Sequence, residues 1–120
     1  GKNIGVFAMQ HGPGAENAFG GVAQAYSESV PILVLPAGYH RRIANYYPNF
    51  NSTLNMQHIT KWAEPLTMGK AIPEVMRRAF FQLRNGRPGP VLRADRISRR
   101  DRLPMTRDSS PNLADRAVSR

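Results

Sequence analysis

Cysteine is absent from this sequence, which excludes a disulfide framework and a thiolate metal site. The three histidines are too far apart along the chain to form a local zinc motif. No apolar run approaches the ~18 consecutive residues that a membrane-spanning helix needs, and no N-terminal segment joins basic residues, an apolar core and a cleavage site. We therefore expect a cytoplasmic chain that does not enter a membrane.

Acidic residues are few, because eight Asp and Glu stand against 17 Lys and Arg, for a formal net charge of +9. A basic balance can indicate nucleic-acid binding, since clustered cations bind phosphate through the release of counterions. Here the adjacent cationic pairs are isolated, acidic residues interrupt the basic C-terminal part, and no aromatic residue that could stack on a base follows Phe81. The sequence therefore does not favour a nucleic-acid partner.

The first part of the chain predicts a strand, a helix and a second strand. Ile4 to Met9 is a short apolar run that leads into a glycine-rich segment, as a buried strand does. Apolar residues then recur at helical spacing over residues 14–29, and another apolar run lies between Pro31 and Pro36. A helical crossover between two apolar strands predicts parallel pairing, with the loop after the first strand at the carboxyl edge of the sheet.

The remainder predicts a long loop, a helix and further strands. Residues 38–55 contain turn-forming and aromatic residues without a clear period and are expected to form a loop. A minor strand is expected at 61–65, a helix over 70–84, and another strand at 88–92. The expected fold class is therefore α/β, with a parallel sheet and flanking helices.

The pattern changes after Leu92. Residues 93–120 hold eight Arg, four Asp and few large apolar side chains, so they bury too little surface to offset the entropy lost on ordering. We expect a basic C-terminal tail that is disordered or loosely attached. The predicted organisation is one domain over residues 1–92 and this tail over 93–120.

The segment Gln10–Gly21, QHGPGAENAFGG, is the main candidate for function. A strand that leads through such a loop into a helix can hold a ligand near the backbone amides of the helix N-terminus. The segment matches neither the Walker loop nor the GxGxxG fingerprint, and Pro13 removes one amide donor. From the residues alone, a ligand loop and a tight structural turn are both open. His11 is favoured for function because histidine is the common acid or base near neutral pH, whereas His40 and His58 are expected to be solvated.

Spaced motifs occur in the first 92 residues, namely GPGAEN from Gly12, GVAQAY from Gly21, SVPIL from Ser29 and GRPGPV from Gly86. In this order they resemble the N-terminal, pyrimidine-binding domain of thiamine-diphosphate-dependent enzymes, and most of all acetolactate-synthase-like members. The resemblance covers residues 1 to about 92, and several motifs in one order are more specific than any one of them.

The resemblance implies that the chain faces the aminopyrimidine ring of thiamine diphosphate and the substrate pocket. A C-terminal domain or a partner chain would hold the diphosphate and its magnesium ion, so no metal ligand is implied here. The intact enzyme would be a carboligase or decarboxylase, a transferase or lyase acting on a 2-oxo acid. His11 is implied as a catalytic residue, and Tyr39 stands where acetolactate synthases often carry glutamine. The implied cofactor-binding residues are Gln10, Gly12, Pro13, Asn17 and Tyr39.

The family's catalytic glutamate belongs to a helix before the strand at Ile4, and neither it nor the diphosphate-binding domain is expected in this chain. The resemblance therefore implies a half-site that is not competent alone. Because further strands would precede Ile4, we also expect an uncovered apolar sheet edge and a homo-oligomer. A non-catalytic oligomerisation or interaction module on the same fold is the open alternative.

Overall fold

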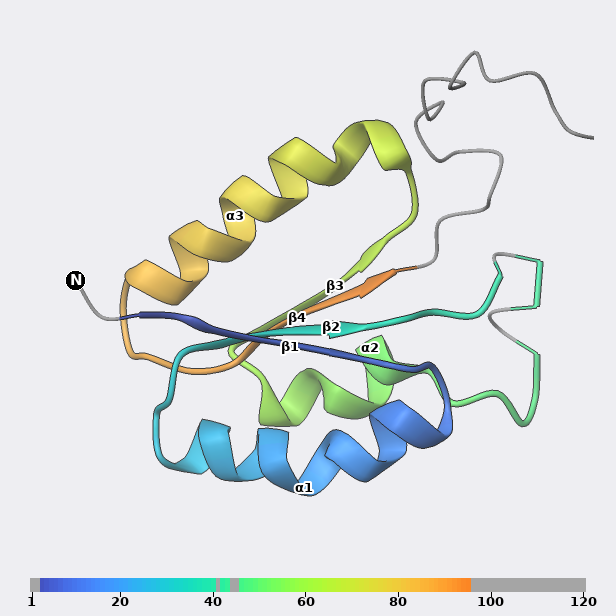
Figure 1. Cartoon of the computed structure of the whole chain (residues 1–120), viewed down its shortest axis with the longest axis horizontal. Coiled ribbons are helices and arrows are strands. Elements are labelled where there is room, and N and C mark those ends of the chain that lie inside the picture. Colours follow the sequence, from blue (N-terminus) through green and yellow to red (C-terminus); the bar gives the residue numbers. More distant parts are fainter. Residues whose placement is uncertain (1–2, 41, 44–45, 96–120) are drawn as a thin grey trace, which may run out of the picture.

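A computed structural model describes residues 3–40, 42–43 and 46–95 of the chain. Within these residues, four strands form one sheet in the order β1-β2-β4-β3, and every neighbouring pair is parallel. Figure 1 shows this sheet between two helical layers. The predicted α/β fold with a parallel sheet is confirmed. The strands are β1 (Gly5–Met9), β2 (Ile32–Pro36), β3 (Trp62–Leu66) and β4 (Val91–Asp95).

The helices lie on both faces of the sheet (Figure 1). Helices α1 (Pro13–Ser27) and α2 (Ser52–Met56) cover one face, and α3 (Ile72–Arg84) covers the other. Single 3-10 turns follow α2 and precede α3, as η1 (Gln57–Ile59) and η2 (Gly69–Ala71). The connections from β1 to β2 through α1 and from β2 to β3 through α2 cross the sheet in one direction. The connection from β3 to β4 through α3 crosses it in the opposite direction. Right-handed crossovers therefore place α3 on the opposite face.

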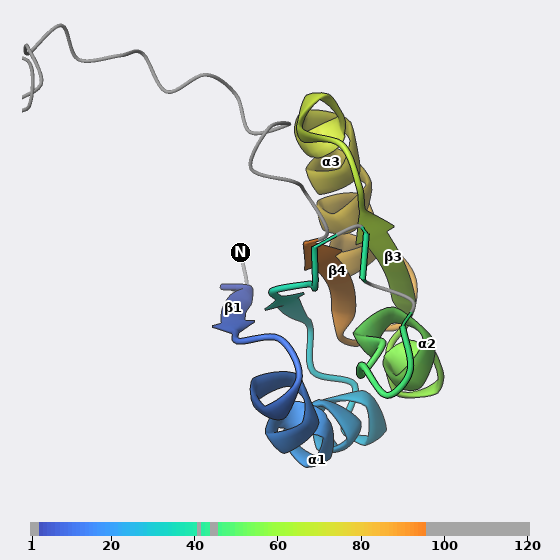
Figure 2. The same ribbon diagram turned by 90° about the vertical axis from the view of Figure 1, so that its right-hand side faces the viewer.

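The hydrophobic core has one part on each face of the sheet. Figure 2 shows α1 and α2 on one side of the strands and α3 on the other. Leu33 and Val34 are neighbours in β2 that belong to different parts, and Val91 and Leu92 in β4 do the same. The two central strands are thus buried on both faces, which explains the continuous apolar sequence of β2 and the apolar start of β4. The part beneath α1 and α2 contains Ala15, Val22, Val34, Met56, Leu92 and Ala94, and the part beneath α3 contains Leu33, Ala79, Leu83 and Val91.

The strand predicted at the start of the chain is present as β1, but the prediction that it is buried is wrong. Strand β1 is at the edge of the sheet, and its first four residues are exposed, with Val6 59% and Phe7 47% accessible. An apolar run indicates a strand but does not indicate its place in the sheet. Within the described residues, no strand pairs with the outer edge of β1.

Two predicted boundaries also differ from the structure. Strand β4 continues past Leu92 to Asp95, and Arg93 is buried, although its charge suggested the start of a tail. The loop predicted over 38–55 ends earlier, because the Asn51 side chain accepts a hydrogen bond of 3.1 Å from the backbone N–H of Leu54 and caps α2. Residues 96–120 of the predicted tail lie outside the described residues.

Candidate functional site

The loops that follow β1 and β2 lie side by side at the carboxyl edge of the sheet. Met9 pairs with Pro36 at the ends of the two strands, and the backbone N–H of Ala37 donates to the carbonyl oxygen of Met9 at 2.8 Å. Segments 10–12 and 37–40 therefore leave the sheet next to each other. In open parallel sheets this edge is where ligands bind, because the loops there are free to vary around a fixed scaffold.

The structure brings together two of the predicted site residues, His11 and Tyr39. Their ring centroids lie 4.6 Å apart with an interplanar angle of 63°, an edge-to-face arrangement. Both side chains are half-buried. Edge-to-face contact is a favoured geometry for aromatic rings, because the positive edge of one ring meets the negative face of the other. The two loops are thus held together by a ring pair that also reaches solvent.

Gly12 lies against the hydroxyl end of Tyr39. Its backbone φ is 59°, a conformation that side chains rarely adopt, and the residue is buried. A Cβ atom at this position would lie 2.6 Å from the Tyr39 hydroxyl oxygen. The turn therefore requires glycine here, and a larger residue would also displace the Tyr39 hydroxyl.

The other predicted site residues surround the ring pair without joining it. Gln10 is exposed at the end of β1, and Pro13 is exposed at the first position of α1. Asn17 is exposed in the second turn of α1, and none of the contacts described joins it to His11 or Tyr39. His58, which the sequence predicts to be solvated, is exposed.

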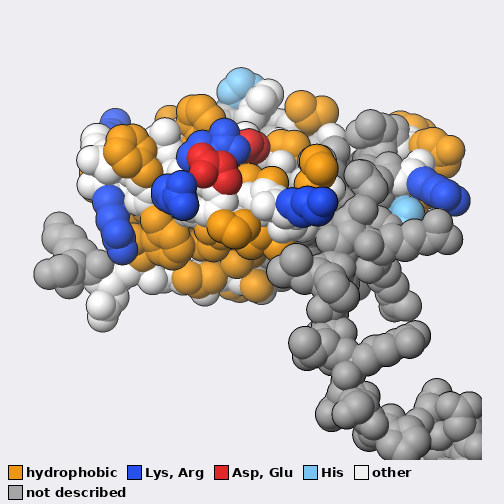
Figure 3. All heavy atoms as spheres, turned by 90° about the horizontal axis from the view of Figure 1, so that it is seen from above, with side chains coloured by type: hydrophobic (Ala, Val, Ile, Leu, Met, Phe, Trp, Pro, Cys, Tyr) orange, Lys and Arg blue, Asp and Glu red, His pale blue; other side chains and the backbone are white. Residues whose placement is uncertain are grey.

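The same edge of the sheet has a pocket of about 340 Å³ that sequence reasoning missed. Figure 3 looks onto the face covered by α3, where hydrophobic side chains gather beside a group of charged ones. All four strands and α3 contribute to the pocket, and its one charged lining residue among those described is Arg93. An arginine beyond an apolar run carries no sequence signal for burial, so Arg93 could not have been found. Its lining includes Met9, Leu35, Leu66, Ile72, Met76 and Arg93.

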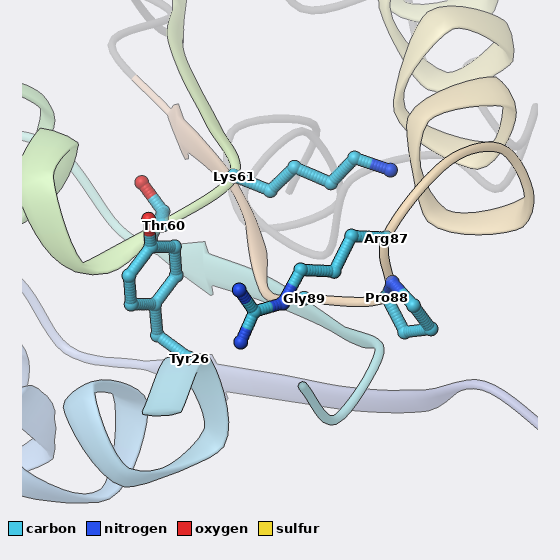
Figure 4. Close-up of a pocket in the computed structure, with 6 residues that line it drawn as sticks. All are labelled: Tyr26, Thr60, Lys61, Arg87, Pro88 and Gly89. Atoms are coloured by element: carbon cyan, nitrogen blue, oxygen red, sulfur yellow. The ribbon is translucent and has the colours of Figure 1, made fainter. Parts of the chain in front are cut away.

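Another pocket, of about 240 Å³, lies at the amino ends of β3 and β4 and is shown in Figure 4. Its two cations are engaged by the chain itself. Lys61 Nζ donates to the backbone carbonyls of Gln82 and Asn85 at the end of α3, and Arg87 Nε donates to Ser29 Oγ at 2.9 Å. The Lys61 bonds join the end of α3 to the start of β3, and the Arg87 bond joins the GRPGPV segment to the turn after α1. The pocket is therefore better explained as part of the scaffold than as a ligand site.

The part of the chain that the structure describes holds no group of three or more His, Cys, Asp or Glu side chains suited to a metal ion. The N-terminus of α1 is also poorly suited to phosphate. Pro13 lacks an N–H there, and Glu16 places a negative charge in the first turn, where the helix dipole would otherwise attract an anion. The carboxyl edge instead presents the rings of His11 and Tyr39 and the backbone of the two loops that carry them.

Comparison with known proteins decides the family. Residues 1–63 match the family model described as "Thiamine pyrophosphate enzyme, N-terminal TPP binding domain". The chain belongs to this family. Thiamine pyrophosphate is thiamine diphosphate under another name, so the resemblance stated from the motifs is confirmed.

Among related proteins, the chain is 32% identical over 91 residues to the acetolactate synthase isozyme 3 large subunit of Escherichia coli (strain K12). This match covers 74% of this chain and 16% of the relative. It is 40% identical over 91 residues to the chloroplastic acetolactate synthase 2 of Nicotiana tabacum, which covers 73% of this chain and 14% of the relative. This thiamine pyrophosphate enzyme domain is thus related to acetolactate synthase and spans only a small part of the length of these relatives.

A solved structure of a protein from Mycobacterium smegmatis, described as a thiamin diphosphate-dependent enzyme, has the same fold. The TM-score is 0.68 at 19% identity, and the match covers 78% of this chain and 18% of the other. Within the described residues, no helix has the length and apolar content needed to cross a membrane.

Proposed function

We propose that this domain forms the pyrimidine-facing half of a thiamine diphosphate site in an acetolactate-synthase-like enzyme. The observation that carries the proposal is the His11–Tyr39 ring pair at the carboxyl ends of β1 and β2, with Gly12 against the Tyr39 hydroxyl. A flat heteroaromatic ring can pack against such a surface, and the exposed amide of Gln10 beside it can exchange hydrogen bonds with ring nitrogens. His11 would serve as the proton-transferring residue at this surface.

The diphosphate and its magnesium ion would be bound by another domain or a partner chain. The described residues supply no metal-binding group, and Pro13 and Glu16 disfavour a phosphate at the start of α1. Phosphates and their metal usually dominate the anchoring of such a cofactor. The domain alone therefore binds thiamine diphosphate weakly and does not catalyse.

In the complete enzyme, thiamine diphosphate supplies the carbanion chemistry needed for a 2-oxo acid substrate. The residues of this chain would position the pyrimidine ring, exclude water from its face and hold a proton at His11. Pro13 and Asn17 would act indirectly, by fixing the start of α1 beneath the loop. Tyr39 replaces the glutamine that acetolactate synthases often carry, so the reaction is either acetolactate formation or a related carboligation or decarboxylation.

The experiment is a thermal melt of the full chain with thiamine diphosphate and magnesium, with and without the C-terminal diphosphate-binding domain of the E. coli relative. We expect the melting temperature of the chain to rise only when that domain is present. A Tyr39→Ala variant should lose this rise, whereas His58→Ala, at an exposed position away from the ring pair, should keep it. Tight magnesium-dependent binding by the chain alone would contradict the half-site.

The alternative is an interaction module on the same fold without catalysis, which the exposed edge of β1 supports. Unpaired backbone groups along an edge strand can pair with another chain. In that case the chain would associate, and thiamine diphosphate would stabilise neither the chain nor its mixture with the diphosphate-binding domain.

A further inference from the structure

Arg93 in β4 is the least expected feature of the pocket at the carboxyl edge. Its side chain has no solvent exposure, and its Nη1 lies 3.2 Å from Glu64 Oε2 in the neighbouring strand β3. Burial lowers the pKa of the Arg93 guanidinium below its ordinary value, which the Glu64 carboxylate opposes and the nearby Arg78 reinforces. A guanidinium nevertheless keeps its charge near neutral pH. The protein thus holds a cation in its interior.

The negative charge beside Arg93 is shared. Glu64 Oε1 lies 3.1 Å from Arg78 Nη2, and Glu64 Oε2 also accepts a hydrogen bond from Trp62 Nε1 at 3.3 Å. One carboxylate therefore serves two guanidinium groups, and the cluster carries an excess positive charge. A second carboxylate would balance it.

Two nitrogens of Arg93, Nε and Nη2, are buried and have no hydrogen-bond partner among the residues that the structure describes. Their N–H groups lie along the same edge of the planar guanidinium, which matches the two oxygens of a carboxylate. An unsatisfied buried donor is costly, and more so when the group is charged. The Nε and Nη2 edge of the Arg93 guanidinium, which could bind a carboxylate through two hydrogen bonds, thus has no partner within the described residues.

The surroundings of Arg93 define the rest of the ligand. Apart from Arg93, the pocket of about 340 Å³ is lined by apolar residues of the strands and α3, a size within the range of small-molecule sites. Met76 lines the same pocket as Arg93, and its flexible side chain can shift when a ligand enters. An alkyl or aryl body would pack against the apolar wall while its acid group meets Arg93.

We propose that this pocket binds a small organic monocarboxylate with an apolar body, whose two carboxylate oxygens accept hydrogen bonds from Nε and Nη2 of Arg93. The proposal does not depend on thiamine diphosphate or on His11 and Tyr39. The experiments can therefore support or contradict the monocarboxylate site and the thiamine diphosphate half-site independently of each other.

The test is titration of the full chain with hexanoate, followed by the ¹H–¹⁵N signal of Arg93 Nε and by calorimetry. 1-Hexanol is the neutral probe of similar shape. We expect millimolar or tighter binding of hexanoate, a shift of the Arg93 signal, and binding of 1-hexanol weaker by about tenfold or more, since hydrogen bonds to a charged group are among the stronger ones. Equal binding of the two probes, or no binding of hexanoate, would overturn the proposal.

Arg93→Met replaces the guanidinium with an apolar side chain and should weaken hexanoate binding by about tenfold or more. Arg77→Met makes the same charge change at an exposed position on α3 and should leave binding unchanged. If Arg93→Met does not fold, Arg93→Lys keeps the charge but loses the fork and should give weaker binding than the parent chain. Parent-like binding by a folded Arg93 variant would assign hexanoate to another place and overturn the proposal.

Discussion

The imidazole of His11 lies edge-to-face against the phenol ring of Tyr39, with 4.6 Å between the ring centroids. The two residues come from loops after different strands, and the parallel pairing of β1 with β2 brings those loops to one edge of the sheet. The order and direction of the strands thus decide that these two side chains meet and form one surface. Gly12 lies against the Tyr39 hydroxyl, and a larger residue there would displace it.

Gly12→Ala should therefore reduce the free energy of unfolding by about 1–3 kcal/mol, the usual cost of a side chain at a strained backbone position. The backbone φ of 59° strains the alanine, and its Cβ would lie 2.6 Å from the Tyr39 hydroxyl oxygen. The measurement is urea denaturation, read as a lower midpoint with an unchanged slope.

Gly20→Ala is the matched control for this substitution. Gly20 lies inside α1, and a Cβ there would meet no atom within 4 Å, so alanine should stabilise the chain by about 0.5–1 kcal/mol. Adding Tyr39→Phe to Gly12→Ala removes the hydroxyl and should restore part of the loss. Equal effects of the two alanines would show that neither φ nor the Tyr39 contact constrains Gly12.

His11→Ala should lower the turnover of a 2-oxo acid by about 10²–10⁴-fold when the domain is part of a complete enzyme that also has the catalytic glutamate and the diphosphate-binding domain, the usual contribution of a positioned acid or base. The measurement is consumption of the substrate at saturating thiamine diphosphate. His58→Ala, at an exposed position, should leave turnover unchanged. His11→Phe keeps an aromatic ring against Tyr39 and should stay folded while losing activity. Near-parent turnover in both His11 variants would remove this residue from the mechanism.

Glu64→Gln should destabilise the chain by about 3–5 kcal/mol, because it leaves the buried Arg93 without a counter-ion. Glu74→Gln is the matched control. Glu74 and Arg77 form an exposed ion pair of 3.1 Å on α3, and the loss of such a pair changes stability by about 1 kcal/mol or less. Both variants are compared with the parent chain by chemical denaturation.

Adding Arg93→Met to Glu64→Gln should recover most of the lost stability. The double variant removes the buried charge together with its partner, and apolar replacements of buried ion pairs are often neutral or stabilising. No recovery would mean that Glu64 supports the fold through Arg78 or Trp62 instead.

The two longer helices, α1 and α3, were predictable because their apolar residues repeat at helical spacing over several turns. Residues 70–84 were expected to form a helix, and α3 occupies Ile72–Arg84, with Val75, Ala79 and Leu83 buried. The place of β1 at the sheet edge was not predictable from burial patterns, since edge and central strands can have the same apolar sequence. It depends on which strands pair, a property of the whole fold.

The candidate site was predictable in part. Parallel crossovers place the loop after β1 at the carboxyl edge, which pointed to His11 and its neighbours. The meeting of His11 with Tyr39 depends on the register of β1 with β2 and on side-chain directions. Arg93 could not be found because arginine is rarely buried, so its position suggested a solvated tail.

The exposed edge of β1 should make the chain self-associate. Val6 and Phe7 are 59% and 47% exposed on a strand whose outer edge has no partner within the described residues. Such an edge offers unpaired backbone groups together with apolar side chains to another chain. We expect oligomers at micromolar concentration in light scattering, and their size should change little with salt, because apolar burial is not screened by ions.

Val6→Lys tests whether β1 is the contact. A lysine on an edge strand opposes pairing with a second copy, because the charge would be buried between the chains. This variant should be smaller in solution than the parent chain. Val30→Lys adds the same charge at an exposed position between α1 and β2 and should not change the size. Oligomers that dissociate in salt, or that respond equally to both lysines, would assign self-association to the net charge of the chain or its distribution rather than to the edge of β1.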